Sequence, residues 1–268
     1  MQRRKGMMLI PLVIAGLVML GQYFSSEKVV NPETGRAARV ALSTQQEEAI
    51  GLQSYHEALS GARVIESGKD YDLVRRVASR LAGVASSDFD WEVSLVDSDQ
   101  VNAFCLPGGK IVVYTGILPY AQTEAALAAV MGHEMAHAVA RHGSQRLLRS
   151  SLAQTFMMGA SASLSMSDMD WNQRRTLMAA LGAGAQYGVI LPFSRDHESE
   201  ADQMGLLYMA RAGYDPREAI KFWQRMAESG GAQPPEFAST HPSHASRIRD
   251  LENFMPKAMA EYEASARR

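Results

Sequence analysis

The sequence has few of the features that would indicate a disulfide-stabilised or nucleic-acid-binding protein. Cys105 is the single cysteine among 268 residues, so no intramolecular disulfide can form, and we expect it to pack as a small apolar residue. Lysine and arginine (27) are balanced by aspartate and glutamate (29), which argues against nucleic acid as a partner. No internal repeat is visible. What the chain does have is 46% hydrophobic residues, enough for a sizeable core.

The N-terminus combines a basic start with a long apolar run. Three basic residues lie within Met1–Lys5, and Gly6–Phe24 has no charged residue. At about 1.5 Å rise per residue, a helix of this length covers the hydrocarbon core of a bilayer. The basic side is expected to stay inside. We therefore expect residues 1–26 to form a single uncleaved transmembrane helix, with a cleaved signal peptide as the alternative.

The rest of the chain is expected to be a linker, residues 27–41, followed by one domain, residues 42–268. Periodic apolar residues predict helices and one strand, and Pro107-Gly108-Gly109 lies between two strand-like runs and predicts a hairpin. The fold class is therefore α+β and mainly helical. The small polar stretch 161–170 is expected to be a mobile loop, and residues 171–193 to form a buried or membrane-grazing hairpin with 152–166. Helices are expected over about 43–59, 70–84, 122–141, 144–166, 194–212, 215–228 and 240–263, and the strand over 91–96.

The most informative stretch is Val130–His142, which contains H-E-x-x-H. His133 and His137 lie one helical turn apart, so both imidazoles can reach one metal ion. Glu134 lies on the same half of the helix and can reach a water at the metal, where a general base is needed. Two histidines beside a non-ligating carboxylate are typical of zinc hydrolases, although the motif alone also occurs by chance on surface helices.

A third ligand is expected from the helix around residues 194–205. Glu198 and Asp202 are four residues apart and share a helix face. Glu198 is the expected third ligand. Asp202 is expected to accept the free ring N–H of a ligand histidine. Glu200 points elsewhere on a helical wheel and is expected to be solvated.

Four ordered segments give the chain a resemblance to a known family. They are Asn102–Ile111 (N-A-F-C-L-P-G-G-K-I), the helix of His133, Ser194–Asp202 (S-R-D-H-E-S-E-A-D) and His241–Ile248 (H-P-S-H-A-S-R-I). Together they resemble family forty-eight of the metallopeptidases, which includes the CAAX prenyl endopeptidases, the Oma-type proteases and proteases of the beta-barrel assembly-enhancing kind. The resemblance runs from about residue 42 to residue 251.

The resemblance implies a gluzincin-type domain with a small sheet beside the H-E-x-x-H helix. It implies one Zn²⁺ on His133, His137 and Glu198, with Glu134 as the base. The chain departs from the family in two ways: Cys105 stands where a small apolar residue is expected, and neither a set of spanning helices nor a tetratricopeptide-like extension is visible.

Further roles follow from general chemistry. The strand containing Asn102, Ala103, Phe104 and Cys105 can pair with an extended substrate backbone. Candidates for the cation that stabilises the oxyanion are Arg247, Arg141 and His197. His241 is either a fourth zinc ligand that holds the enzyme latent or an ordinary turn histidine.

The expected function is a zinc-dependent endopeptidase of the cell envelope that cleaves misfolded or misassembled membrane or envelope proteins. Its expected partners are extended polypeptides and the membrane, without nucleic acid. The expected location is the bacterial inner membrane, single-pass with the catalytic domain in the periplasm, or the periplasm itself if a signal peptide is cleaved. Two alternatives remain: a zinc-containing chaperone or scaffold with secondary proteolysis, and a zinc hydrolase of non-peptide substrates.

Overall fold

The computed structural model describes residues 2–228, 237, 241 and 247–267, with side chains from residue 9 onward except at 188 and 189. The chain forms two compact units. We call Met1–Val30, Arg36–Ser43 and Gly143–Asp196 the helical unit, and Asn31–Gly35, Thr44–His142 and His197–Arg268 the sheet unit.

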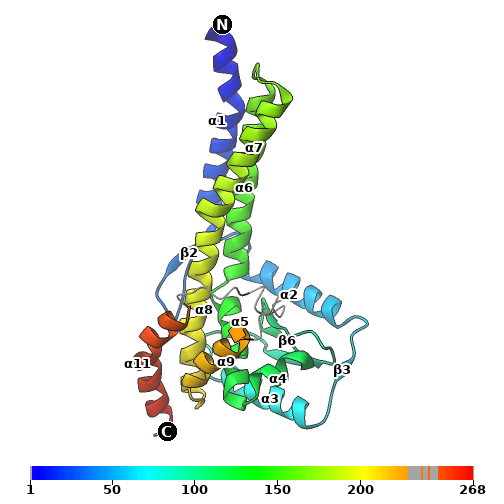
Figure 1. The fold of residues 1–268 in the computed structure, drawn as a ribbon, viewed down its shortest axis with the longest axis vertical. Helices are drawn as coiled ribbons and strands as arrows, with labels where there is room; N and C mark the ends of the chain where they lie inside the picture. The colour runs from blue at the N-terminus through cyan, green and yellow to red at the C-terminus, as the bar shows by residue number, and fades with distance from the viewer. Residues whose placement is uncertain (1, 229–236, 238–240, 242–246, 268) are drawn as a thin grey trace. The chain divides into compact units, whose positions relative to one another are not determined.

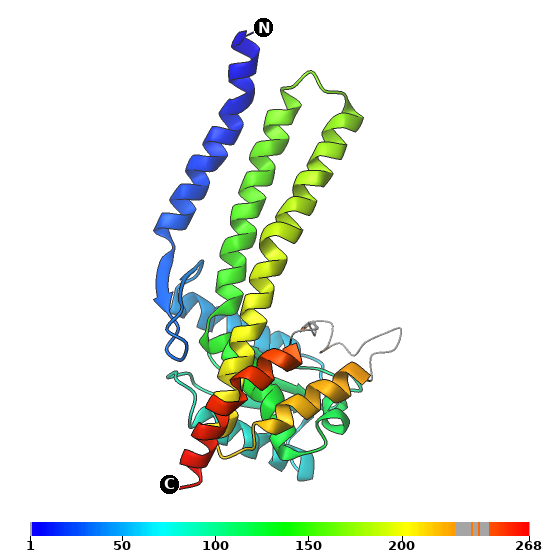
Figure 2. The same cartoon turned by 60° about the vertical axis from the view of Figure 1, so that its left-hand side comes forward.

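The helical unit is built on three long helices. They are α1 (Gln2–Ser25), α6 (His142–Ser165) and α7 (Trp171–Ala185), which run alongside one another in Figures 1 and 2. Gly159 allows α6 to approach α1 closely, since a Cβ there would lie 2.4 Å from the Cβ of Ala15. Asp170 begins α7 with a capping box, because it accepts from the backbone N–H of Gln173, whose side chain accepts from the Asp170 N–H.

The same unit contains two strands and a π-helical turn. Strand β1 (Glu27–Val30) pairs antiparallel with β2 (Ala37–Val40). After α7, the π-helical turn η2 (Gln186–Ile190) leads directly into α8 (Leu191–Arg211).

The structure adds detail to three expectations about this part of the chain. Residues 27–41, the expected linker, contain the β1–β2 sheet, and the Asn31 side chain accepts from the backbone N–H groups of Glu33 and Thr34 in the turn. The first half of the expected mobile loop 161–170 is helical, since α6 continues to Ser165. Among the described helices, none is long and apolar enough to span a membrane, so the expected transmembrane helix is not confirmed; α1 is the helix at that place.

The sheet unit places a four-stranded sheet beside α5 (Glu124–Val139). The strand order is β3 (Val64–Ile65), β4 (Glu92–Val96), β6 (Lys110–Tyr114), β5 (Ala103–Leu106). Strands β4 and β6 are parallel, and β5 pairs antiparallel with β6 from Ala103–Val113 to Leu106–Lys110. The predicted hairpin is confirmed. Its turn needs Gly108 and Gly109, which have φ of 79° and 84°.

The other helices of this unit enclose α5. They are α2 (Thr44–Leu59), α3 (Lys69–Ala82), the short η1 (Thr115–Ile117) and α4 (Leu118–Ala121), α9 (Arg217–Glu228) and α11 (Arg247–Ser265). Helix α5 is buried on nearly all sides and is rich in alanine, which has the highest helix propensity. Its first turn is capped by Thr123, whose side chain accepts from the Ala126 N–H. The H-E-x-x-H motif therefore lies on a rigid, water-excluded helix.

Candidate metal centre

The two histidines of the motif converge as their spacing predicts. On α5, the Nε2 atoms of His133 and His137 lie 3.1 Å apart. His133 and Glu134 are buried, and His137 is only slightly exposed. Two imidazole nitrogens this close, both aimed at one point, are suited to sharing a metal ion.

Glu198 reaches the same point from α8. Its carboxylate oxygens lie 3.3 Å from His133 Nε2 and 3.5 Å from His137 Nε2. Around a tetrahedral zinc with bonds of about 2.0–2.1 Å, neighbouring ligand atoms are about 3.3–3.4 Å apart. The separations among these three side chains therefore fit a tetrahedral zinc ion.

His241 completes the cluster as a fourth potential donor. Its Nδ1 lies 3.2 Å from His133 Nε2 and 3.0 Å from Glu198 Oε2. The potential ligand atoms of all four residues lie within 4.8 Å of one another. His241 Nε2 also lies 3.2 Å from Glu134 Oε1. The neighbouring Pro242 and His244 lie outside the described residues.

Asp202 and Arg247 contact His133 at Nδ1, the ring nitrogen that does not face Glu198. Asp202 Oδ1 is 2.9 Å from His133 Nδ1 and accepts from Arg247 Nη2 at 2.6 Å. The Arg247 guanidinium lies 3.3 Å from the centre of the Trp223 ring, and its Nη1 donates to the His241 carbonyl. Arg247 is thus engaged with Asp202 and with the segment that carries His241.

A chain of four polar residues that begins at His137 Nδ1 was not predicted from the sequence: His142, Glu200, Asn31 and Thr34. His137 Nδ1 and His142 Nδ1 are 2.9 Å apart, and His142 Nε2 is 2.9 Å from Glu200 Oε2. The other Glu200 oxygen accepts from Asn31 Nδ2 at 2.8 Å and from Thr34 Oγ1 at 2.6 Å. The expectation that Glu200 is solvated was wrong: its exposed fraction is 6%, because α8 is buried on both of its carboxylate-bearing faces.

The other two candidates for an oxyanion-stabilising cation lie elsewhere. Arg141 forms a close ion pair with Glu47 of α2. His197 stacks on His142, with ring centres 4.0 Å apart. Neither residue belongs to the four-residue cluster.

At His133 and Glu198, hydrogen bonds between oppositely charged groups oppose the effect of burial on the pKa. Burial alone would lower the pKa of His133, but hydrogen bonds to Asp202 and Glu198 outweigh it and raise the pKa to about 9. Burial would raise the pKa of Glu198, yet its hydrogen bonds to His133 and His241 hold it well below the ordinary value. For Glu134, burial dominates and its pKa is raised. Burial, with the Glu134 charge, also raises the pKa of the Cys105 thiol.

The expected substrate strand lies at a sheet edge beside α5. In the described sheet, β5 is the last strand and pairs only with β6. Ala103 is buried, whereas Phe104 and Cys105 are half-buried, and the buried Asn102 side chain accepts from the Ala103 N–H. Just before β5, the Val101 carbonyl accepts from the Phe237 N–H.

A buried H-E-x-x-H helix with a glutamate from a second helix is the architecture of a metallopeptidase. The sequence comparisons give the particular family. Residues 69–255 match the profile of Peptidase family M48, and the chain belongs to this family. It carries the metalloendopeptidase core.

Named relatives agree with this assignment. The chain is 36% identical over 251 residues to the fission yeast mitochondrial metalloendopeptidase OMA1, covering 91% of this chain and 72% of the relative. It is 31% identical to the human mitochondrial metalloendopeptidase OMA1 over 264 residues (91% and 49%). It is 30% identical to the beta-barrel assembly-enhancing protease of Yersinia pestis over 226 residues (83% and 46%). The chain thus spans about half the length of the latter two.

Proposed function

We propose that the chain is a zinc-dependent endopeptidase whose ligands are His133, His137 and Glu198. The observation that carries the proposal is the meeting of these donor atoms, with His241, inside 4.8 Å. Nitrogen and carboxylate donors at tetrahedral separations favour zinc over calcium or magnesium, which prefer all-oxygen sites with six or more ligands.

Glu134 is proposed as the general base. When bound, the metal supplies Lewis acidity, which acidifies water and polarises a carbonyl. Glu134 takes the proton from the attacking water at its carboxylate and later delivers it to the leaving amine. Burial raises the pKa of Glu134, which makes its carboxylate a stronger proton acceptor than an exposed glutamate.

The neighbouring residues orient the proposed ligands. Asp202 accepts from His133 Nδ1, which leaves the Nε2 lone pair directed at the metal. Arg247 keeps Asp202 charged and in place, because its Coulombic attraction lowers the pKa of that carboxyl against the opposing effect of burial. We therefore assign Arg247 a positioning role and do not assign it to the oxyanion.

The proposed substrate is an extended polypeptide that pairs with β5. The edge position of β5 supports this proposal, because backbone hydrogen bonds to a strand edge require no particular side chains. Cleavage of a test peptide should weaken when the backbone amides that flank its scissile bond are N-methylated. If the methylated and unmethylated peptides were cleaved equally fast, the proposed β-pairing would be wrong.

The function is tested by comparing the full chain with Glu134→Gln. The variant should keep its zinc and lose casein cleavage by at least about 10²-fold, the usual contribution of a general base. Glu57→Gln, at an exposed position of α2, is the matched control and should cleave normally. Cleavage by Glu134→Gln at the wild-type rate would disprove the assignment. A cellular role that survives this substitution would favour the scaffold alternative.

His241 is proposed to occupy the fourth metal position in a latent state. Its Nδ1 already lies at ligand separation from His133 and Glu198, so it competes with water for that position. His241→Ala should raise basal cleavage while zinc content stays the same. Unchanged or reduced activity would reject a latch.

We also propose that the enzyme associates with membranes and acts on membrane or envelope proteins. The support is a set of exposed, large apolar side chains in the helical unit, including Leu17 (64% exposed), Phe24 (69%) and Trp171 (69%). The name of the Yersinia pestis relative, beta-barrel assembly-enhancing protease, agrees with this substrate class. A single-pass periplasmic topology stays a prediction.

A further inference from the structure

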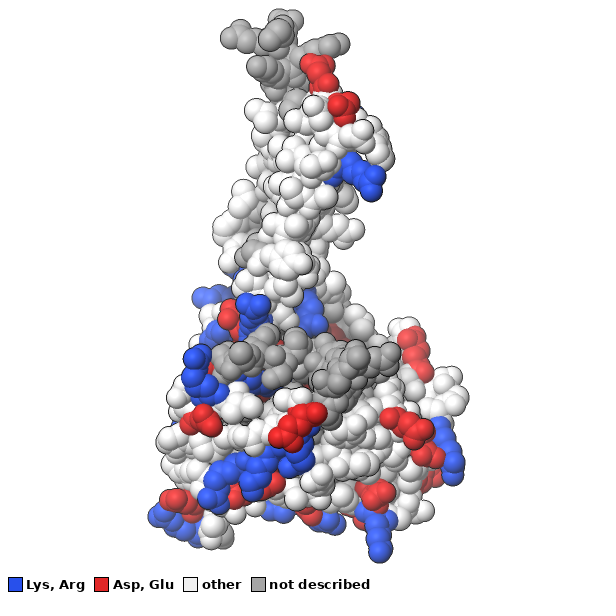
Figure 3. Space-filling model, viewed as in Figure 1, with Lys and Arg blue, Asp and Glu red and all other residues white. Residues whose placement is uncertain are grey.

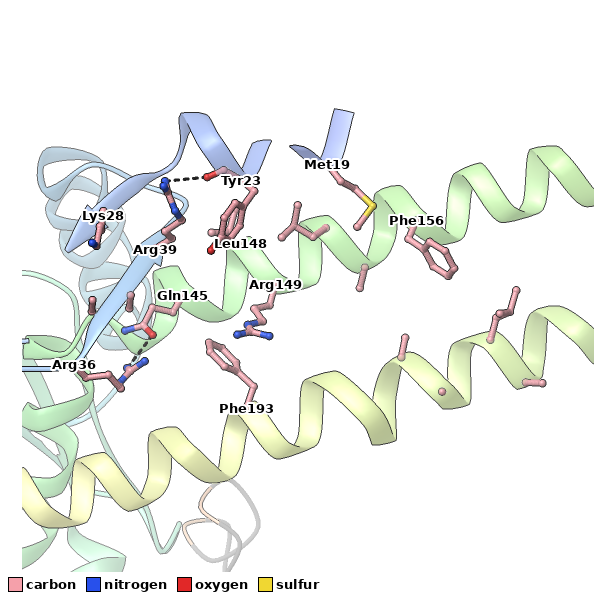
Figure 4. Close-up of a pocket in the computed structure, with 18 residues that line it drawn as sticks. Met19, Tyr23, Lys28, Arg36, Arg39, Gln145, Leu148, Arg149, Phe156 and Phe193 are labelled. Atoms are coloured by element: carbon pink, nitrogen blue, oxygen red, sulfur yellow. Dashed lines mark hydrogen bonds between the residues drawn. The ribbon is translucent and has the colours of Figure 1, made fainter. Parts of the chain in front are cut away.

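The helical unit contains a cavity that takes no part in the proposed peptidase site. Its volume is about 930 Å³, within the range of pockets that hold small organic ligands. The end of α1, the sheet β1–β2 and helices α6 and α7 supply its walls (Figure 4). All of its lining residues belong to the helical unit.

One end of this cavity is basic. Lys28, Arg36, Arg39 and Arg149 line it, and no aspartate or glutamate is among the lining residues. Figure 4 shows the first three together where the strands lie. In a chain with a formal charge of −2, four cations around one cavity form a local site for an anion.

Three of the basic side chains have contacts that fix their position at the cavity. Arg36 donates to the Gln145 side chain at 2.9 Å. Arg39 donates to the backbone carbonyls of Tyr23 and Ser26 at 3.1 and 2.6 Å. Arg149 lies 4.0 Å from the centre of the Phe193 ring. These contacts orient the guanidinium groups at the basic end of a cavity whose lining contains no carboxylate.

The opposite end of the cavity is apolar. Met19, Leu152, Phe156 and Leu181 line it, and small residues on α7, Ala180 and Gly184, leave room between the helices. Figure 4 shows Met19 and Phe156 displaced along the helices from Lys28 and Arg36. The cavity therefore has one cationic and one apolar end.

We propose that this cavity binds an anionic phospholipid, with the phosphate at the basic end and an acyl chain between α6 and α7. Charge complementarity selects an anionic head, and the apolar end accepts a hydrocarbon chain. An extended peptide fits less well between α6 and α7, because these helices have their backbone groups already paired and would leave those of a peptide unsatisfied.

The surroundings of the cavity agree with a lipid ligand. Beyond the cavity, α1, α6 and α7 expose large apolar side chains, among them Leu17, Met158 and Leu177. In the view of Figure 3, the part of these helices that is not grey shows almost no charged side chains except near the α6–α7 turn. Such a surface gives a lipid direct access to the helices that line the site.

Native mass spectrometry of the full chain in detergent tests the proposal. Dimyristoyl phosphatidylglycerol and dimyristoyl phosphatidylcholine have the same acyl chains and differ in head-group charge, and inorganic phosphate represents the head alone. A stoichiometric adduct is expected with phosphatidylglycerol, at least about fivefold tighter than with phosphatidylcholine, and none with phosphate. Each Lys or Arg near an anionic lipid head contributes an attraction of this order.

Two pairs of variants locate the ligand. Arg149→Gln should weaken phosphatidylglycerol binding about fivefold, whereas Arg146→Gln, on the same helix but outside the cavity, should leave it unchanged. Ala180→Phe fills the cavity and should abolish the adduct. Ala179→Phe, an exposed neighbour outside the lining, is its steric control.

The outcomes separate the possible ligands. Equal binding of the two lipids, or an adduct that survives Ala180→Phe, would show lipid adsorbed on the outer apolar surface and overturn the proposal. Binding of phosphate as tight as phosphatidylglycerol would show a site for free anions. A peptide recovered with the purified protein and lost from Ala180→Phe would assign the cavity to polypeptide.

Discussion

At the scale of single residues, each α5 histidine of the metal centre has its second ring nitrogen held by a different polar group. His133 contacts Asp202 directly, whereas His137 contacts His142, which contacts Glu200. Because Glu200 is a carboxylate, it accepts from His142 Nε2–H, so His142 Nδ1 is an acceptor and His137 Nδ1 must donate. This hydrogen-bond chain leaves the His137 Nε2 lone pair free to bind the proposed metal.

The first prediction concerns Glu200→Gln. The new amide retains an oxygen for Asn31 and Thr34 but presents N–H groups to His142, which would then carry its proton on Nδ1 and oppose the His137 Nδ1 proton. Zinc affinity, measured by competition with a chelator, should fall about 10–100-fold, as for other residues that orient a ligand histidine. Glu57→Gln is the control. Unchanged affinity would show that this hydrogen-bond chain does not orient His137.

The second prediction concerns pH. The metal-free site holds a proton on His133 at pH 7, because its pKa is raised to about 9, whereas His137 and Glu198, whose pKa values are lowered, hold none. Zinc must displace that proton, so apparent affinity should rise about tenfold per pH unit up to about pH 9 and level off above it.

Calorimetry in buffers of different ionisation enthalpy measures the proton released. About one proton per zinc is expected at pH 7. Asp202→Asn removes a partner that raises the pKa of His133, so its proton release should be smaller. Release of no proton from the wild-type protein at pH 7 would contradict the assignment.

Sequence reasoning finds residues whose role depends on local spacing and misses those that depend on tertiary contacts. His133, His137, Glu198 and Asp202 follow from helical periodicity, and the structure brings them together as that periodicity predicts. Glu200 could not be found in this way. Its partners Asn31 and His142 are 169 and 58 residues away in the sequence, and a helical wheel does not show that both faces of α8 are covered.

At the scale of elements, the metal centre depends on the close approach of α5 and α8. A Cβ on Gly205 would lie 3.0 Å from the His133 backbone nitrogen, and one on Gly132 would lie 3.2 Å from the Gly205 carbonyl oxygen. Both contacts are with backbone, which cannot rotate away. Glycine at these two positions therefore allows α8 to lie close to α5, and this close approach brings Glu198 to the two histidines.

The third prediction tests this helix contact. Gly205→Ala should push α8 from α5, lower the free energy of unfolding by about 1–3 kcal/mol and reduce zinc content. Gly143→Ala, also helical but with nothing within 4 Å of its added Cβ, should be neutral or stabilise by up to about 1 kcal/mol. Chemical denaturation and metal analysis measure both. Equal effects of the two substitutions would show that the close contact of α5 and α8 at Gly205 does not stabilise the metal centre.

Elements with a strong periodic pattern are also the ones that the sequence predicts well. The stripe Leu73, Val74, Val77 and Leu81 predicts α3, and the turn Pro107–Gly109 predicts the β5–β6 hairpin. The sheet β1–β2 is not predicted, because its strands are only four residues long and flank a polar turn. The π-helical turn at Gln186–Ile190 has no sequence signature that distinguishes it from α-helix.

At the scale of the whole molecule, the two units have different surfaces. The helical unit exposes apolar side chains along α1, whereas the sheet unit buries the proposed peptidase site. The fourth prediction is that Leu17→Lys weakens flotation of the full chain with phosphatidylglycerol vesicles by about tenfold, since a buried leucine contributes about 1.5–3 kcal/mol. Leu52→Lys, an exposed leucine of α2, should have no such effect. Equal flotation of both variants would show that α1 does not contact the bilayer.

The spacing of the four metal donors along the chain has a consequence for the timing of biosynthesis. His133 and His137 leave the ribosome more than sixty residues before Glu198, and His241 follows more than forty residues later. A nascent chain that has not yet delivered α8 cannot assemble the centre, so it cannot cleave its neighbours or itself during synthesis. The order of the donors in the sequence thus delays proteolytic competence until the fold around α5 is nearly complete.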